Sequence, residues 1–138
     1  MFKKLSLLLS VLFVATILVA CGGGNSEIDN YLSDNEDTLV SIFGNMGLGD
    51  DFEMTTSGDN QLVVNFEVTE ASYETMSGMA MFDDAGSAFE AFINDVSASH
   101  MYNLATAITN ETDLDSATIR IIINFDGEEL TTLTFNSQ

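Results

Sequence analysis

The stretch TIRIIINFDGEELTTLTF, residues 118–135, decides the fold class of this chain. Its two halves, 118–123 and 129–135, are rich in β-branched residues, and they flank the dipeptide Asp126-Gly127, which is a strong signal for a tight turn. The stretch therefore predicts a β-hairpin. Its turn is either a four-residue type I turn with a left-handed Gly127 or a two-residue Asp-Gly loop.

The side chains of the first half alternate between two faces of the predicted strand. Ile119, Ile121 and Ile123 fall on one face, which we expect to pack against helices. Arg120 falls on the opposite face, where we expect it to pair with a carboxylate.

A second hairpin is predicted over 52–57 and 61–68, which are separated by Gly58-Asp59-Asn60. The second of these runs alternates cleanly, with four apolar residues on one face: Leu62, Val64, Phe66 and Val68. Such alternation is typical of a strand that is buried on one face only.

The remaining periodic segments predict helices. Ser26 begins an S-x-x-D cap for a short helical turn over 27–32, and a second cap precedes a helix over 34–46. The region 70–109 keeps one face apolar, as one long bent helix or as two helices broken near 83–87 or 95–98. The order α-β-β-α-β-β predicts a two-layer α+β domain with an antiparallel sheet of about four strands.

The N-terminal segment predicts an export signal. Two lysines precede an apolar run over 5–18, which is shorter than the roughly 20 residues that a membrane-spanning helix needs. The run ends in Leu18-Val19-Ala20-Cys21, which resembles a bacterial lipobox. This resemblance implies cleavage between Ala20 and Cys21 and attachment of diacylglycerol to the Cys21 thiol. A plain signal peptide and an uncleaved membrane helix are the alternatives.

The lipobox interpretation divides the chain into three parts. Residues 1–20 are the signal peptide, 21–25 are the lipidated cysteine and a flexible spacer, and 26–138 are a single acidic domain. The expected location is the extracytoplasmic face of the bacterial cell membrane, with the lipid on Cys21 as the contact to the membrane. Because Cys21 is the only cysteine, an intramolecular disulfide is excluded.

Charge restricts the partners of this domain. All 22 acidic residues follow Cys21, whereas Arg120 is the only lysine or arginine there, which leaves a side-chain charge of −21. Nucleic-acid binding requires basic surface and is therefore not expected. The acidity either keeps the domain soluble in saline or alkaline surroundings or attracts cations or a basic partner. The candidate cation contacts are Asp50, Asp51, Asp83, Asp84, Asp113 and Asp115.

No catalytic residue, cofactor or metal site is expected. The sequence lacks a glycine-rich phosphate loop, a pair of histidines and a metal-binding Cys/His spacing. The expected function is a non-catalytic binding or interaction module, which could use Met76, Met79 and Met81 as an adaptable groove. An acidic, cation-associating surface protein is the alternative, and a carboxylate-dependent hydrolase is a third, less favoured one.

The order of these signals resembles an uncharacterised family of Gram-positive lipoproteins, domain of unknown function 4854. The resemblance rests on the lipobox, DNYLS at 29–33, GDNQLVV at 58–64 and the closing hairpin up to Phe135. It implies a surface lipoprotein and carries over neither an activity nor a catalytic residue. This chain departs from the family pattern because its mature part contains no lysine.

Overall fold

The computed structural model describes residues 26–79 and 84–138, so the signal segment, Cys21 and Asp83 lie outside the described residues. The first helices and hairpin are α2 (Glu27–Asp34), α3 (Glu36–Gly44), β1 (Phe52–Ser57) and β2 (Gln61–Glu67). The second half of the domain consists of α4 (Glu70–Ser77), α5 (Ala85–Val96), α6 (Ala98–Glu111), β3 (Thr118–Phe125) and β4 (Glu128–Asn136). Among the described helices, none is both long enough and apolar enough to cross a bilayer.

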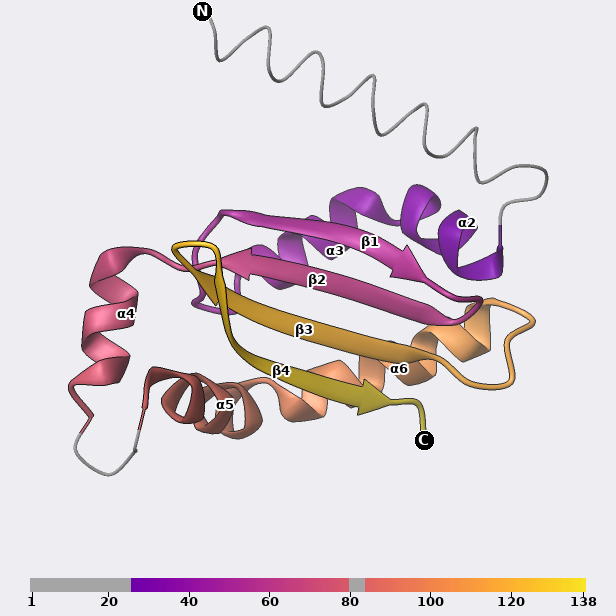
Figure 1. Cartoon of the computed structure of the whole chain (residues 1–138). Helices are drawn as coiled ribbons and strands as arrows, with labels where there is room; N and C mark the ends of the chain where they lie inside the picture. Colours follow the sequence, from indigo (N-terminus) through magenta and orange to yellow (C-terminus); the bar gives the residue numbers. More distant parts are fainter. Residues whose placement is uncertain (1–25, 80–83) are drawn as a thin grey trace, which may run out of the picture.

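The four strands form one sheet in the order β1-β2-β3-β4 (Figure 1). The two hairpins are antiparallel, but β2 and β3 are parallel, with Gln61 opposite Thr118 and Phe66 opposite Ile123. The α+β class is therefore confirmed, whereas the purely antiparallel sheet was wrong. The physical reason is the connection from Glu67 to Thr118, which carries three helices and returns the chain to the end of the sheet where β2 begins.

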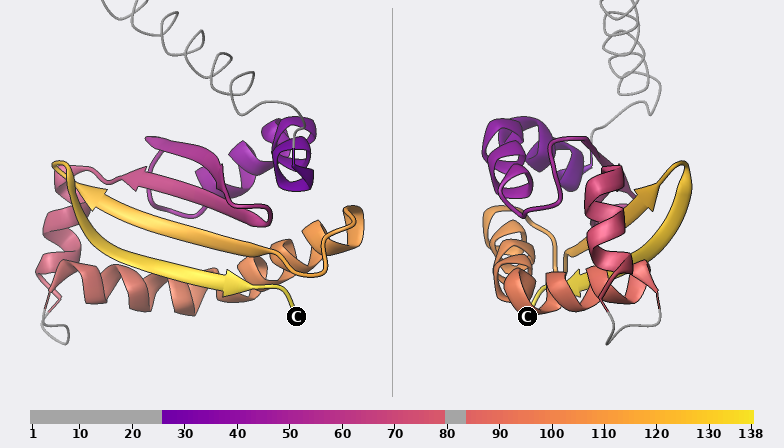
Figure 2. Two further views of the ribbon diagram at one scale, coloured as in Figure 1. Left: turned by 45° about the vertical axis from the view of Figure 1, so that its right-hand side comes forward. Right: turned by 90° about the vertical axis from the view of Figure 1, so that its left-hand side faces the viewer.

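The described helices lie on one face of the sheet, and none of them lies on the opposite face, which we term the uncovered face. The right-hand view of Figure 2 shows α2, α3 and α6 together on one side of the strands. Ile119, Ile121 and Ile123 are fully buried on that side, as predicted, together with Leu62, Val64 and Phe66. Burial of these aliphatic and aromatic side chains is the main source of stability for this layer arrangement.

Arg120 is half-buried on the uncovered face, as the alternation predicted. Its direct cross-strand neighbours are Val63 on β2 and Thr134 on β4, so neither neighbour is the expected carboxylate. Val63 is only 6% exposed although it lies outside the apolar core cluster. Neighbouring side chains on the uncovered face therefore shield it from water.

The two predicted N-terminal helices are present, and only the helical region 70–109 is divided more finely than expected. The segments 27–32 and 34–46 correspond to α2 and α3, with Asn35 between them. The region 70–109 forms α4, α5 and α6, so both candidate breaks occur rather than one. Asp84 caps α5 by accepting a hydrogen bond from the Ser87 amide at 2.7 Å, which fixes where that helix begins.

The turn of the C-terminal hairpin has two residues. Asp126 and Gly127 both have positive φ, 52° and 79°, as a type I′ turn requires. The four-residue alternative was therefore wrong and the two-residue alternative is confirmed. Beyond the turn, Asn124 pairs with Glu129 but Ile123 pairs with Thr131, so β4 has one extra residue in a bulge.

Candidate functional site

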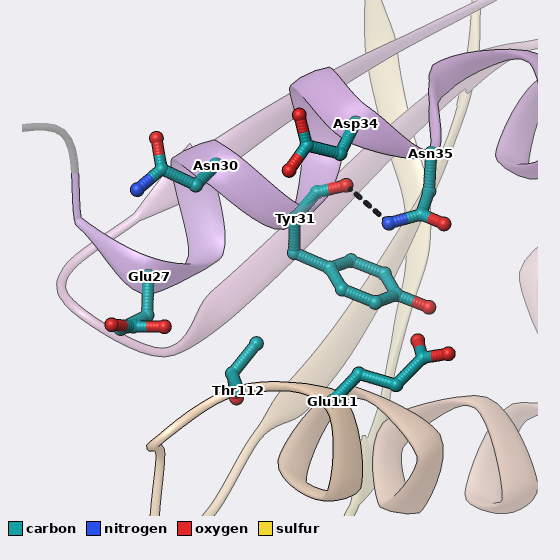
Figure 3. Close-up of a pocket in the computed structure, with 7 residues that line it drawn as sticks. All are labelled: Glu27, Asn30, Tyr31, Asp34, Asn35, Glu111 and Thr112. Atoms are coloured by element: carbon teal, nitrogen blue, oxygen red, sulfur yellow. Dashed lines mark hydrogen bonds between the residues drawn. The ribbon is translucent and has the colours of Figure 1, made fainter.

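A polar hollow of about 340 Å³ lies between α2 and the C-terminal end of α6 (Figure 3). Its volume is within the range of about 300–1,000 Å³ that is usual for small-ligand sites. The lining combines four residues of α2 with the residue after it and two residues at the end of α6: Glu27, Asn30, Tyr31, Asp34, Asn35, Glu111 and Thr112. No apolar residue other than the tyrosine ring contributes.

The spacing of residues in α2 places its contribution on one side of the helix. Asn30 and Tyr31 are adjacent and lie three or four residues from both Glu27 and Asp34, which brings the four residues onto neighbouring turns. The helix is held at its start by Ser26, whose hydroxyl accepts a hydrogen bond from the Asp29 amide. Ile28 is fully buried beneath it, so α2 presents a fixed polar side to the hollow.

The opposite wall is fixed by the end of α6. Thr112 follows the last residue of this helix, Glu111, and its hydroxyl donates a hydrogen bond to the Ile108 carbonyl at 2.6 Å. This bond satisfies one of the carbonyl groups that a helix end leaves free. Ile108 itself is fully buried, and the wall is therefore anchored to the core.

Tyr31 joins the two walls. The residue is 8% exposed, and its ring reaches across to Glu111 (Figure 3). Burial, together with the negative charge of Glu111 and a hydrogen bond to its side chain, raises the pKa of Tyr31 to about 12. The phenol is therefore neutral at physiological pH, and its hydroxyl group faces the Glu111 carboxylate (Figure 3).

The hollow is rich in hydrogen-bond acceptors. Asn35 donates its side-chain amide to the Tyr31 carbonyl at 3.0 Å, which leaves the amide oxygen of Asn35 available. Glu27, Asp34 and Glu111 contribute carboxylates, and no lysine, arginine or histidine is among the lining residues. Ionised carboxylates only accept hydrogen bonds, so the hollow is suited to a donor that carries positive charge.

Metal ligation requires several ligands that converge on one point. In the described part of the chain, no group of three or more His, Cys, Asp or Glu side chains is close enough to hold a metal ion. The three carboxylates of the hollow therefore line a space rather than a single coordination point. This arrangement suits an organic cation of several atoms better than a bare ion.

The aspartates that the sequence suggested as cation contacts are not gathered at one place. Asp50 and Asp51 are exposed before β1, and the Asp51 carbonyl accepts the amide of Glu67 at the end of β2. Asp113 and Asp115 are exposed in the connection that leads to β3, which starts at the other end of β2.

Asp84 has a structural role in the cap of α5. A hydrogen bond from the Ser87 backbone amide, with a further one from the Ser87 side chain, lowers the pKa of Asp84 below its usual value. Asp83, its neighbour among the suggested contacts, lies outside the described residues. The cap accounts for the position of Asp84 without a bound cation.

The suggested methionine groove is only partly described. Met76 packs partly against the core, and Met79 is 42% exposed, whereas Met81 lies outside the described residues. Full burial of these side chains would exclude a groove. Met76 and Met79 are not fully buried, so the groove stays a prediction.

The sequence contained no signal for the hollow. Tyr31 and Glu111 are 80 positions apart, and each has an ordinary local interpretation, as an apolar-face residue of a helix and as an acid at a helix end.

Comparisons of the chain with protein-family models, with curated proteins and with solved structures gave no match. The resemblance to the lipoprotein family therefore stays a prediction.

Proposed function

We propose that this chain is a lipoprotein of the extracytoplasmic membrane face and that its acidic domain is a non-catalytic binding module. The observation that carries the proposal is the Leu18-Val19-Ala20-Cys21 stretch, in which the only cysteine of the chain occupies the lipobox position. Two acyl chains on Cys21 would anchor the protein stably, because each buried CH₂ contributes about 0.8 kcal/mol.

The proposed anchor would keep the hollow close to the bilayer. Six residue steps separate Cys21 from Glu27, the first residue of α2, and a fully extended chain covers at most about 3.5 Å per residue. The start of α2 therefore lies within about 20 Å of the lipidated cysteine. Because the domain is strongly acidic, repulsion from anionic lipids would favour a tethered position over one flat on the surface.

We propose that the hollow binds an organic cation that carries ammonium or guanidinium groups. Three carboxylates, two side-chain amides and two hydroxyl groups surround a space of about 340 Å³, and none of them carries positive charge. The neutral phenol of Tyr31 lies beside Glu111 in the lining and can donate a hydrogen bond to this carboxylate or to a ligand. In this proposal, the hollow is the place where the acidic domain would associate with a cation.

Mass spectrometry of the intact protein from a bacterial membrane fraction tests the anchor. We expect a diacylated species that begins at Cys21, and we expect globomycin, which inhibits lipoprotein signal peptidase, to abolish it. Replacement of Cys21 by serine is the control and should leave the precursor unmodified. A secreted chain without lipid would refute the anchor, whatever the hollow binds.

Calorimetry with the diamine putrescine tests the hollow independently of the anchor. Glu111→Gln removes one lining carboxylate, and Asp113→Asn removes the same charge two residues away, outside the lining. One exposed charge pair contributes up to about 1 kcal/mol, so we expect Glu111→Gln to weaken binding about fivefold. Equal effects of the two variants, or no binding by the wild type, would refute the assigned site.

A further inference from the structure

We draw no further inference here: the strongest candidate, the uncovered face of the sheet around Arg120 and Val63, carries nothing because no feature of the described residues shows what covers it.

Discussion

The first turn of α5 runs so close to β4 that residue 86 has no room for a side chain. A Cβ atom built on Gly86 would lie 2.3 Å from the Leu130 carbonyl oxygen and 3.1 Å from the carbonyl carbon. Leu130 is the extra residue of the β4 bulge, since Glu129 and Thr131 take the pairing positions on either side of it. Both surfaces in this contact are backbone, so Gly86→Ala forces a helix and a strand apart.

Two opposing effects set the size of the change in stability. Alanine is favoured over glycine within a helix by up to about 1 kcal/mol. Insertion of a methyl group into a closely packed contact costs about 1–3 kcal/mol, and the upper part of that range applies where no side chain can rotate away. We therefore expect Gly86→Ala to lower the free energy of unfolding by about 1–2 kcal/mol, which corresponds to a fall in Tm of about 4–8 °C for a domain of this size.

Urea unfolding followed by circular dichroism measures this difference, and the chain offers a matched control. Gly44 is the last residue of α3, and a Cβ atom built there has no atom within 4 Å. Gly44→Ala should therefore leave the free energy of unfolding unchanged or raise it by up to about 1 kcal/mol. If Gly86→Ala proved as stable as the wild type while the slope of the urea transition stayed the same, the close approach of α5 to β4 would be wrong.

Three further substitutions test other contacts of the fold. Tyr31→Phe removes a phenol whose pKa is raised from 10.0 to about 12. Between pH 10 and 12 this phenol ionises only in the unfolded state, so the wild type should lose stability there and the variant should not. Parallel stability curves for the two proteins over that interval would contradict this prediction. Burial would raise the pKa of Asp29, but hydrogen bonds from Thr56 and Ser26 outweigh it and lower this pKa below 3.8. Thr56→Val should therefore lower the free energy of unfolding, measured in urea at pH 7, by about 1 kcal/mol. The difference from the wild type should shrink as the pH falls below 3.8. Tyr73 stacks on Phe125 with ring centroids 4.2 Å apart, and α4 contains no buried residue, so Tyr73→Ala should accelerate amide hydrogen exchange in α4 and leave exchange in α6 unchanged.

Strands and their buried faces were predictable because a strand has a period of two that is read directly from neighbouring residues. The alternation of Leu62, Val64 and Phe66 identified the inner face of β2, and all three are fully buried. The Asp126-Gly127 turn was predictable for a similar reason, since only a few residue pairs adopt two successive positive φ angles easily. In each case the information lies within a few residues of sequence.

The hollow was not predictable because its walls meet only through the tertiary fold. α2 is the first described helix of the chain, whereas Glu111 is the last residue of α6, in the second half of the domain. Nothing in the composition of either segment distinguishes a lining acid from a solvated one, and 22 acidic residues provide many equivalent alternatives. Glu111 differs from the other acids in lying beside Tyr31, and this proximity exists only because the C-terminal end of α6 lies opposite α2 in the fold.

The parallel pairing of β2 and β3 depends on how the helical connection is broken. A continuous helix over 70–109 would be about 60 Å long, whereas an eight-residue strand such as β3 spans about 26 Å. The helical region therefore has to break if it is to cover the sheet. Whether the break is a reversal or only a bend decides the direction in which the chain arrives at β3.

The structure shows a bend at Ser97, between α5 and α6, and these two helices follow one another along the sheet (Figure 1). The Ser97 amide donates to the Ile93 carbonyl at 2.8 Å, and its carbonyl accepts from the Met101 amide at 3.0 Å, so hydrogen bonding of the helical kind continues through the break. Two antiparallel helices need a loop of about two to five residues, and one residue is too short for a reversal. Because α5 and α6 keep one direction, the chain crosses the whole sheet before Thr118, and β3 can only run parallel to β2.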